Sequence, residues 1–452
     1  MWFALDASRG IEDPLMKIFM RATVVISEYL VYVPAVVTFL RRYTRMHSVP
    51  VWSSSIALSA ILLQPATILI DHGHFQYNTV MLGLVVASLD AIMAGRMLWA
   101  CIFFVGALGY KQMALYYAPV MFAFLLGICI FPRIRVIRLF CIALVTIATF
   151  AILFLPLMLG ATSGEAEKNV QAIPEPPLLQ TLPLKLDHES SLYLLLFQFT
   201  QIIHRVFPFS RGLFEDKVAN AWCAIHTFYK LHLLEPTLLK KVSLGATLAS
   251  ILIPCSIIFR HPRASTLLPA LATVGWGFFL FSFQVHEKSV LLPLLPMTLL
   301  LAGDGGLNKD TRSWVGWANI VGSWTLYPLL NREGLRVPYF VLTSLWAYLL
   351  GLPPTTWQIY RHQQSFGQAE PNPEPHGLSK LIHSSFYVAM VGWHVLEAFV
   401  PPPSDKPDLW VVLNVLIGVA GFGISYLWCL WKLISQSRRM DYRAEEAQKK
   451  NQ

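Results

Sequence analysis

The chain is divided into a long series of apolar segments separated by short polar connections. A helix needs about 20 apolar residues to cross the hydrocarbon core of a bilayer, and residues 51–70 and 79–94 are two segments of about that length. Backbone groups in lipid must pair within their own segment, so such segments fold as helices. Hydrophobic residues make up 55% of the 452 residues and charged residues only 13%. The sequence therefore predicts an all-α polytopic membrane protein with about thirteen transmembrane helices.

The net charge of +9 does not indicate a nucleic-acid partner, because the basic residues are grouped in short connections such as 41–45 and 133–138. Cytosolic loops of membrane proteins carry this excess of Lys and Arg. The six cysteines are scattered and include no C-x-x-C pair. Their spacing indicates neither a disulfide framework nor a zinc site.

A long polar region interrupts the apolar series between residues 160 and 241. Within it, residues 191–204 are apolar enough for an interfacial helix. Residues 218–234 fit either a transmembrane span or a non-spanning segment. If the segment does not span, the later basic clusters lie on the cytosolic side, as the positive-inside rule expects, so the non-spanning alternative is favoured. The expected organisation has four parts: an N-terminal transmembrane module (1–160), a large luminal loop with interfacial helices (161–241), a second transmembrane module (242–352), and C-terminal spans with a cytosolic tail (353–452).

Residues 71–78, with the sequence DHGHFQYN, place a carboxylate, two imidazoles and two amides between two apolar runs. A carboxylate at the bilayer centre costs about 3 kcal/mol, so we expect Asp71 at an interface or in a hydrated cavity, within a tight luminal turn. Three alternatives remain. The turn caps two helices, or it binds or reacts with a substrate, or Asp71, His72 and His74 hold a metal, although they lack the spacing of familiar metal motifs.

Two further polar segments are expected on the same luminal side. Residues 284–288, with the sequence QVHEK, form either part of a site or a solvated loop. Residues 204–217 alternate cations, anions and aromatic residues. Arg205, Arg211 and Lys217 could bind a lipid phosphate, or the segment could simply anchor the chain at the headgroups. His394 and Glu397, inside a late apolar run, are expected to be polar core residues or a helix contact rather than ligands.

Several of these motifs carry a resemblance to a known family. Residues 71–78, 211–220 and 281–288, together with 2–10 and 111–117, resemble the endoplasmic-reticulum glucosyltransferases that use dolichyl-phosphate glucose. These enzymes belong to the type C glycosyltransferase superfamily. Gly73 and Gln284 are similar to the member that adds the first glucose to the nine-mannose lipid-linked oligosaccharide. The sibling that adds the second glucose remains an alternative.

The resemblance implies an inverting transfer in the endoplasmic-reticulum membrane with the active face luminal. In that reaction a mannose 3-hydroxyl attacks the anomeric carbon and dolichyl phosphate leaves, with no metal or cofactor. A carboxylate base and cations for the phosphate are needed. Asp71 is the candidate catalytic residue. The candidate substrate-binding residues are His72, His74 and Gln76 for sugar hydroxyls, Arg205, Arg211, His286 and Lys288 for the phosphate, and Glu215, Asp216, Lys217 and Glu287 beside them.

Family members are expected to carry an extra span and a luminal loop with the acidic base before residues similar to Trp2–Gly10. This sequence begins at Met1, just after that loop, so the family's base is expected upstream of Met1. We therefore expect the chain to transfer little glucose by itself, with Asp71 as the remaining luminal carboxylate. Two functions from other classes stay open. Polar residues within spans also mark ion pathways, as in a transporter, and the chain could bind dolichol-linked lipid without turnover.

Overall fold

The computed structural model describes residues 13–161, 174–181, 187, 190–206, 217–303, 307–361 and 375–450. All regular elements in these ranges are helices. The first group comprises α1 (Pro14–Ser27), α2 (Val33–Met46), α3 (Val51–Leu62), α4 (Pro65–Ile68), α5 (Asn78–Met93), α6 (Met97–Tyr110), α7 (Ala118–Ile130) and α8 (Val136–Ala161). The second comprises α10 (Pro177–Gln180), α11 (Ser191–Val206), α12 (Ala221–Phe228), α13 (Pro236–Arg260), α14 (Leu267–Phe281) and α15 (Leu291–Leu299). The last comprises α16 (Lys309–Thr325), α17 (Tyr327–Arg332), α18 (Arg336–Leu349), α19 (Gly377–Phe399) and α20 (Leu409–Lys450).

A helix lies on every apolar segment that the sequence predicts to span the membrane. In the described ranges, seven helical stretches are long and apolar enough to cross a bilayer, and α5 and α6 are shorter apolar helices. The all-α polytopic class is thus confirmed. The total of about thirteen membrane crossings was predicted from the lengths of the apolar segments, and it stays a prediction.

The long polar region contains short helices in its described part. α12 has 8 residues and ends before a single 3₁₀ turn, Leu231–Leu233. At 1.5 Å per residue such a helix is about 12 Å long, which is too short to cross the hydrocarbon core. This length favours the non-spanning alternative for residues 218–234, which stays a prediction. α11 covers the segment expected to be an interfacial helix, and its position at a membrane surface stays a prediction.

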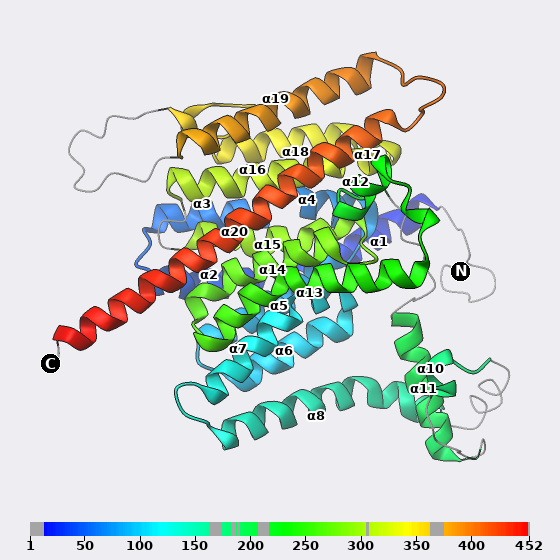
Figure 1. Cartoon of the computed structure of the whole chain (residues 1–452), viewed down its shortest axis with the longest axis vertical. Coiled ribbons are helices and arrows are strands. Elements are labelled where there is room, and N and C mark those ends of the chain that lie inside the picture. Colours follow the sequence, from blue (N-terminus) through cyan, green and yellow to red (C-terminus); the bar gives the residue numbers. More distant parts are fainter. Residues whose placement is uncertain are drawn as a thin grey trace.

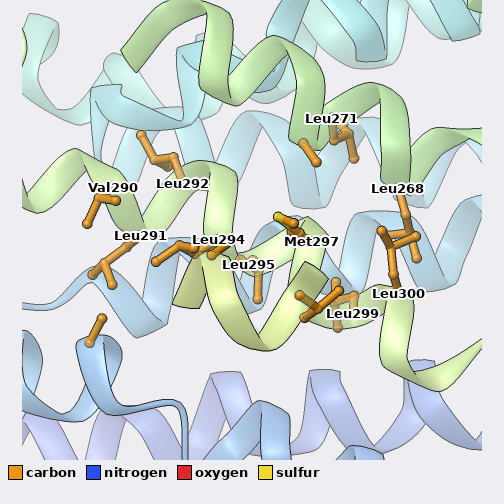
Figure 2. Close-up of a cluster of buried hydrophobic side chains, with 14 of the residues drawn as sticks. Leu268, Leu271, Val290, Leu291, Leu292, Leu294, Leu295, Met297, Leu299 and Leu300 are labelled. Atoms are coloured by element: carbon orange, nitrogen blue, oxygen red, sulfur yellow. The ribbon is translucent and has the colours of Figure 1, made fainter. Parts of the chain in front are cut away.

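The helices lie side by side across the long axis of the molecule, and α20 crosses them obliquely (Figure 1). α19 lies at one end of this stack, while α8 lies at the opposite end with α10 and α11 next to it. The centre is formed by α14 and α15, every residue of α15 being buried. Figure 2 shows the leucines of these two helices packed together with Met297. Such packing fixes the loops that follow each helix.

Two segments of π-helix interrupt the N-terminal helices. Glu28–Tyr32 lies between α1 and α2, and Leu69–Phe75 follows α4. π-helical turns are rare in proteins, and those that do occur often lie at functional sites. α5 packs closely on the first of them, because a Cβ built on Gly83 would lie 2.8 Å from Tyr32 Cα. Small residues at helix contacts permit this close approach of backbones in membrane proteins.

We predict that Gly83→Ala lowers the thermal unfolding midpoint of the purified protein in detergent. The added methyl group meets backbone, which cannot rotate away, and overpacking of this kind costs about 1–3 kcal/mol. Gly245→Ala in α13 is the matched control, because nothing lies within 4 Å of a Cβ built there. Equal midpoints for the two variants would contradict the close packing of α5 on Glu28–Tyr32.

Candidate active site

The carboxylate of Asp71 lies at the centre of the polar turn and has 0% of its surface exposed. One oxygen accepts a hydrogen bond from Asn78 Nδ2 at 2.7 Å, and the other accepts from the backbone N–H of Thr79 at 2.6 Å. Thr79 is in the first turn of α5, where backbone N–H groups lack helical partners and attract negative charge. Asp71 therefore ties the π-helical turn to the beginning of α5.

The two histidines of the turn pair with carboxylates from other parts of the chain. His72 Nε2 contacts Glu28 Oε2, and Glu28 is 5% exposed in the first π-helical segment. His74 Nδ1 contacts Glu333 Oε1, in the residue that follows α17. An imidazole beside a carboxylate is held in one orientation, which suits a group that must direct a hydrogen bond to a ligand.

Gly73, between these histidines, lies against the loop before α18. A Cβ built on Gly73 would approach Leu335 Cδ1 to 2.9 Å, so a larger side chain at residue 73 requires the Leu335 side chain to move. The Gly73 carbonyl accepts a hydrogen bond from Arg21 Nη2 at 3.4 Å. The turn is thereby in contact with both α1 and the segment between α17 and α18.

Gln76 and Asn78 share a cation that the sequence analysis did not select. Lys111 Nζ donates to Gln76 Oε1 at 3.1 Å and to Asn78 Oδ1 at 2.5 Å. Asn78 Nδ2 also donates to Gln76 Oε1 at 3.0 Å. The ammonium therefore fixes the amide that holds Asp71. Burial lowers the pKa of Lys111, the charge of Asp71 raises it, and the charge of Lys288 lowers it further.

Packing brings the second polar turn toward the first, because the 3₁₀ turn after Lys111, Gln112–Tyr117, contacts α14 and α15, the helices on either side of the segment 284–288. The segment 284–288 connects α14 with the 3₁₀ turn Glu287–Val290. Among the residues that the structure describes, the Lys288 ammonium has no hydrogen bond or ion pair. Two ammonium groups close together repel one another, and an anion between them would relieve that repulsion.

The other predicted substrate-binding residues are not all brought to this place. His286 is exposed and Glu287 is half-buried in the same turn as Lys288. Arg205 is exposed near the end of α11, a helix that packs on α8 and α10. Lys217 forms an ion pair with Asp408, which precedes α20.

Some of the predicted positions cannot be placed, because they lie outside the described residues. These are Arg211, Glu215, Asp216, Met1 and the matched residues 2–10. The expectation that the catalytic base of the family lies upstream of Met1 therefore stays a prediction, and so does the low activity that was expected from it.

The polar residues expected in the core of the late helices are partnered as predicted. His394 Nε2 and Tyr339 OH are 3.1 Å apart, and Glu397 accepts a hydrogen bond from Asn331 Nδ2 at 3.1 Å.

Three residues of the site were missed by the sequence analysis. Lys111 carried a signal, since it is a single lysine between two apolar helices and is part of a matched motif. Glu28 lies inside an apolar run, where an acidic residue is a marker of function. Glu333 had no local signal, because it is 259 residues from His74 in the sequence.

These features define a class: a polytopic helical membrane protein with a buried polar site, in which carboxylates and imidazoles pair beside two ammonium groups. The sequence profile of the ALG6, ALG8 glycosyltransferase family matches residues 1–173 and 190–431. The chain belongs to this family.

Relatives named as glucosyltransferases align with almost the whole chain. The probable dolichyl pyrophosphate Man9GlcNAc2 alpha-1,3-glucosyltransferase of Schizosaccharomyces pombe is 38% identical over 441 residues, covering 97% of this chain and 76% of the relative. The Saccharomyces cerevisiae enzyme with the same activity in its name is 38% identical over 459 residues, with 97% and 77% covered. The Gallus gallus enzyme is 31% identical over 451 residues, with 94% and 79% covered.

We predict that Lys111→Met in the full-length protein lowers kcat for sugar transfer about 10- to 100-fold without preventing folding. The substitution keeps the apolar stem but removes the donor shared by Gln76 and Asn78, and hydrogen bonds to charged groups contribute about 1.5–3 kcal/mol. Lys241→Met is the control, since Lys241 is exposed near the beginning of α13. A Lys111→Met variant with normal kcat would remove this ammonium from the site.

Proposed function

We propose that this chain transfers glucose from dolichyl-phosphate glucose to the terminal mannose of dolichyl-pyrophosphate-linked Man9GlcNAc2, forming an alpha-1,3 linkage. The observation that carries the proposal is the Lys111 ammonium bonded to the polar turn 71–78, next to the helices α14 and α15 that flank the turn of Lys288. The names of the relatives supply the acceptor and the linkage.

The donor follows from the chemistry of a leaving phosphate. The mannose 3-hydroxyl attacks the anomeric carbon of glucose, the bond from that carbon to the phosphate oxygen breaks, and dolichyl phosphate leaves with the bonding electron pair. Charge develops on the phosphate oxygens, and positioned cations stabilise it most when they lie in a site that excludes water. Lys288 takes this role because its ammonium remains available, and Lys111 adds positive potential while it holds Gln76 and Asn78.

The hydroxyl proton must pass to a base within hydrogen-bond reach. We propose that the acidic base implied by the family resemblance accepts this proton, because the other candidate, Asp71, is enclosed by its partners. The two oxygens of Asp71 accept hydrogen bonds from Asn78 and Thr79, and the carboxylate has no exposed surface. We therefore assign to Asp71 the positioning of the turn. His72 and His74, held by Glu28 and Glu333, are proposed to orient sugar hydroxyls.

Lys288→Gln tests the proposed donor site. In the full-length protein reconstituted in liposomes, this variant should lower kcat with dolichyl-phosphate glucose about 100- to 1,000-fold, as loss of one stabilising donor does for an oxyanion. Lys240→Gln is a control for the loss of one positive charge. Lys240 is exposed, and its Nζ lies 5.7 Å from the ring centroid of Phe283, which precedes the turn 284–288.

If the wild-type protein binds both lipids but forms no glucosylated product, the chain is a lipid-binding protein and not a glucosyltransferase. Normal turnover by Lys288→Gln would exclude the second turn from the site.

The proposed location is the endoplasmic-reticulum membrane with the polar turns on the luminal side. Single cysteines at exposed positions decide the side, in a background without the six native cysteines. His286→Cys lies in the second turn and Arg133→Cys lies in the connection between α7 and α8. In sealed microsomes a membrane-impermeant maleimide should label the Arg133 variant and should reach the His286 variant only after permeabilisation. The opposite pattern would invert the orientation.

A further inference from the structure

A cavity separate from the site lies between α16, α18 and α19. Its volume is about 110 Å³, and most of its lining is apolar. Apolar cavities of about 150 Å³ are large enough to bind benzene, so this one can take the end of a small ring or chain. No Lys, Arg, Asp or Glu is among its lining residues, which disfavours a charged ligand.

The walls of the cavity carry polar atoms that lack partners in the described structure. Trp324 Nε1, Thr343 Oγ1 and His394 Nδ1 are each buried without a hydrogen bond, and all three residues line the cavity. Trp324 is 1% exposed and Thr343 is 8% exposed. Leaving such a group unpaired costs about 1–3 kcal/mol. A ligand with a hydrogen-bonding group at this point would recover that free energy.

Thr343 differs from Thr149 and Thr298, two other threonines in apolar helices. Thr149 donates to the carbonyl of Val145, and Thr298 donates to the carbonyl of Leu294, each at 2.7 Å and four residues back. This local bond is the usual way for a helical threonine to satisfy its hydroxyl. Thr343 does not make it, so its hydroxyl remains available to a ligand in the cavity.

His394 offers a complementary partner. Its Nε2 is 3.1 Å from Tyr339 OH, and a neutral imidazole has one donor and one acceptor nitrogen. Whichever role Nε2 takes toward Tyr339, Nδ1 keeps the other. The indole N–H of Trp324 can only donate. A hydroxyl group, which both donates and accepts, can pair with either a donor or an acceptor among these atoms.

The cavity opens on an apolar surface. Phe340 is 39% exposed and Val391 is 51% exposed, and both line the cavity. α19 lies at the outer end of the helix stack in Figure 1, and its exposed large side chains are Leu378, Leu381, Val388, Val391, Val395, Leu396 and Phe399. An apolar surface of this kind on a membrane protein faces lipid. The ligand therefore enters from the bilayer.

We propose that this cavity binds the hydroxyl-bearing end of a neutral lipid alcohol. The hydroxyl bonds with Trp324, Thr343 and His394, and the apolar body leaves past Phe340 and Val391 into the bilayer. Sterols and long-chain isoprenoid alcohols share this chemistry. The site does not depend on the transfer reaction, because none of the residues that line it belongs to the turn 71–78 or the turn 284–288.

Photo-crosslinking in vesicles tests the proposal. The full-length protein is exposed to a photoreactive sterol and, separately, to a photoreactive isoprenoid alcohol, each compared with its methyl ether. We expect at least one alcohol to label peptides of α18 or α19 about fivefold more than its ether, as one net hydrogen bond of about 1 kcal/mol predicts. Whichever alcohol labels identifies the source of the ligand.

Two variants provide matched controls. Val391→Trp narrows the mouth of the cavity and should abolish this labelling, whereas Val388→Trp, at a position that is 68% exposed on the same helix and does not line the cavity, should preserve it. Thr343→Val keeps the shape and should reduce the preference for alcohol over ether. Equal labelling by alcohol and ether in the wild-type protein, or labelling unchanged by Val391→Trp, would overturn the proposal.

Discussion

The buried carboxylate of Asp71 is the constraint on which the site depends. A carboxylate with no exposed surface loses its hydration, and only hydrogen bonds from well-placed donors can compensate for that loss. Asn78 Nδ2 and the Thr79 N–H provide these bonds, and Lys111 in turn fixes Asn78. The π-helical turn, the beginning of α5 and the connection after α6 therefore have to be in place together. This arrangement presents the remaining polar groups of the turn as one unit.

The same turn joins distant parts of the chain. His72 reaches Glu28 in the first π-helical segment, and His74 reaches Glu333 after α17. From α17 a second polar contact continues outward, because Asn331 bonds to Glu397 in α19. Each contact pairs a polar group that would be costly to leave unsatisfied away from water. The N-terminal helices and the late helices are thus held at fixed positions around the polar site.

The helices and the polar turns could be predicted from the sequence, because length and hydropathy determine which segments cross a bilayer. The place of Asp71 in a polar turn followed from the polar stretch between two apolar runs. The partners Glu28 and Glu333 could not be predicted, since they are 44 and 259 residues from the histidines that they contact. Lys111 carried a local signal, but its bonds to Gln76 and Asn78 could not be predicted, since they join residues 35 and 33 positions apart.

The most direct test of this account exchanges the carboxylate and amide of the turn. If Asp71 positions the turn, Asp71→Asn alone should lower kcat for glucose transfer strongly, because the amide can no longer accept from both Asn78 and Thr79. The double variant Asp71→Asn with Asn78→Asp restores a carboxylate–amide hydrogen bond and keeps an acceptor for Lys111. The account predicts that the double variant recovers at least part of the lost kcat. A double variant as inactive as Asp71→Asn would contradict it and indicate that the carboxylate at residue 71 itself takes part in the chemistry.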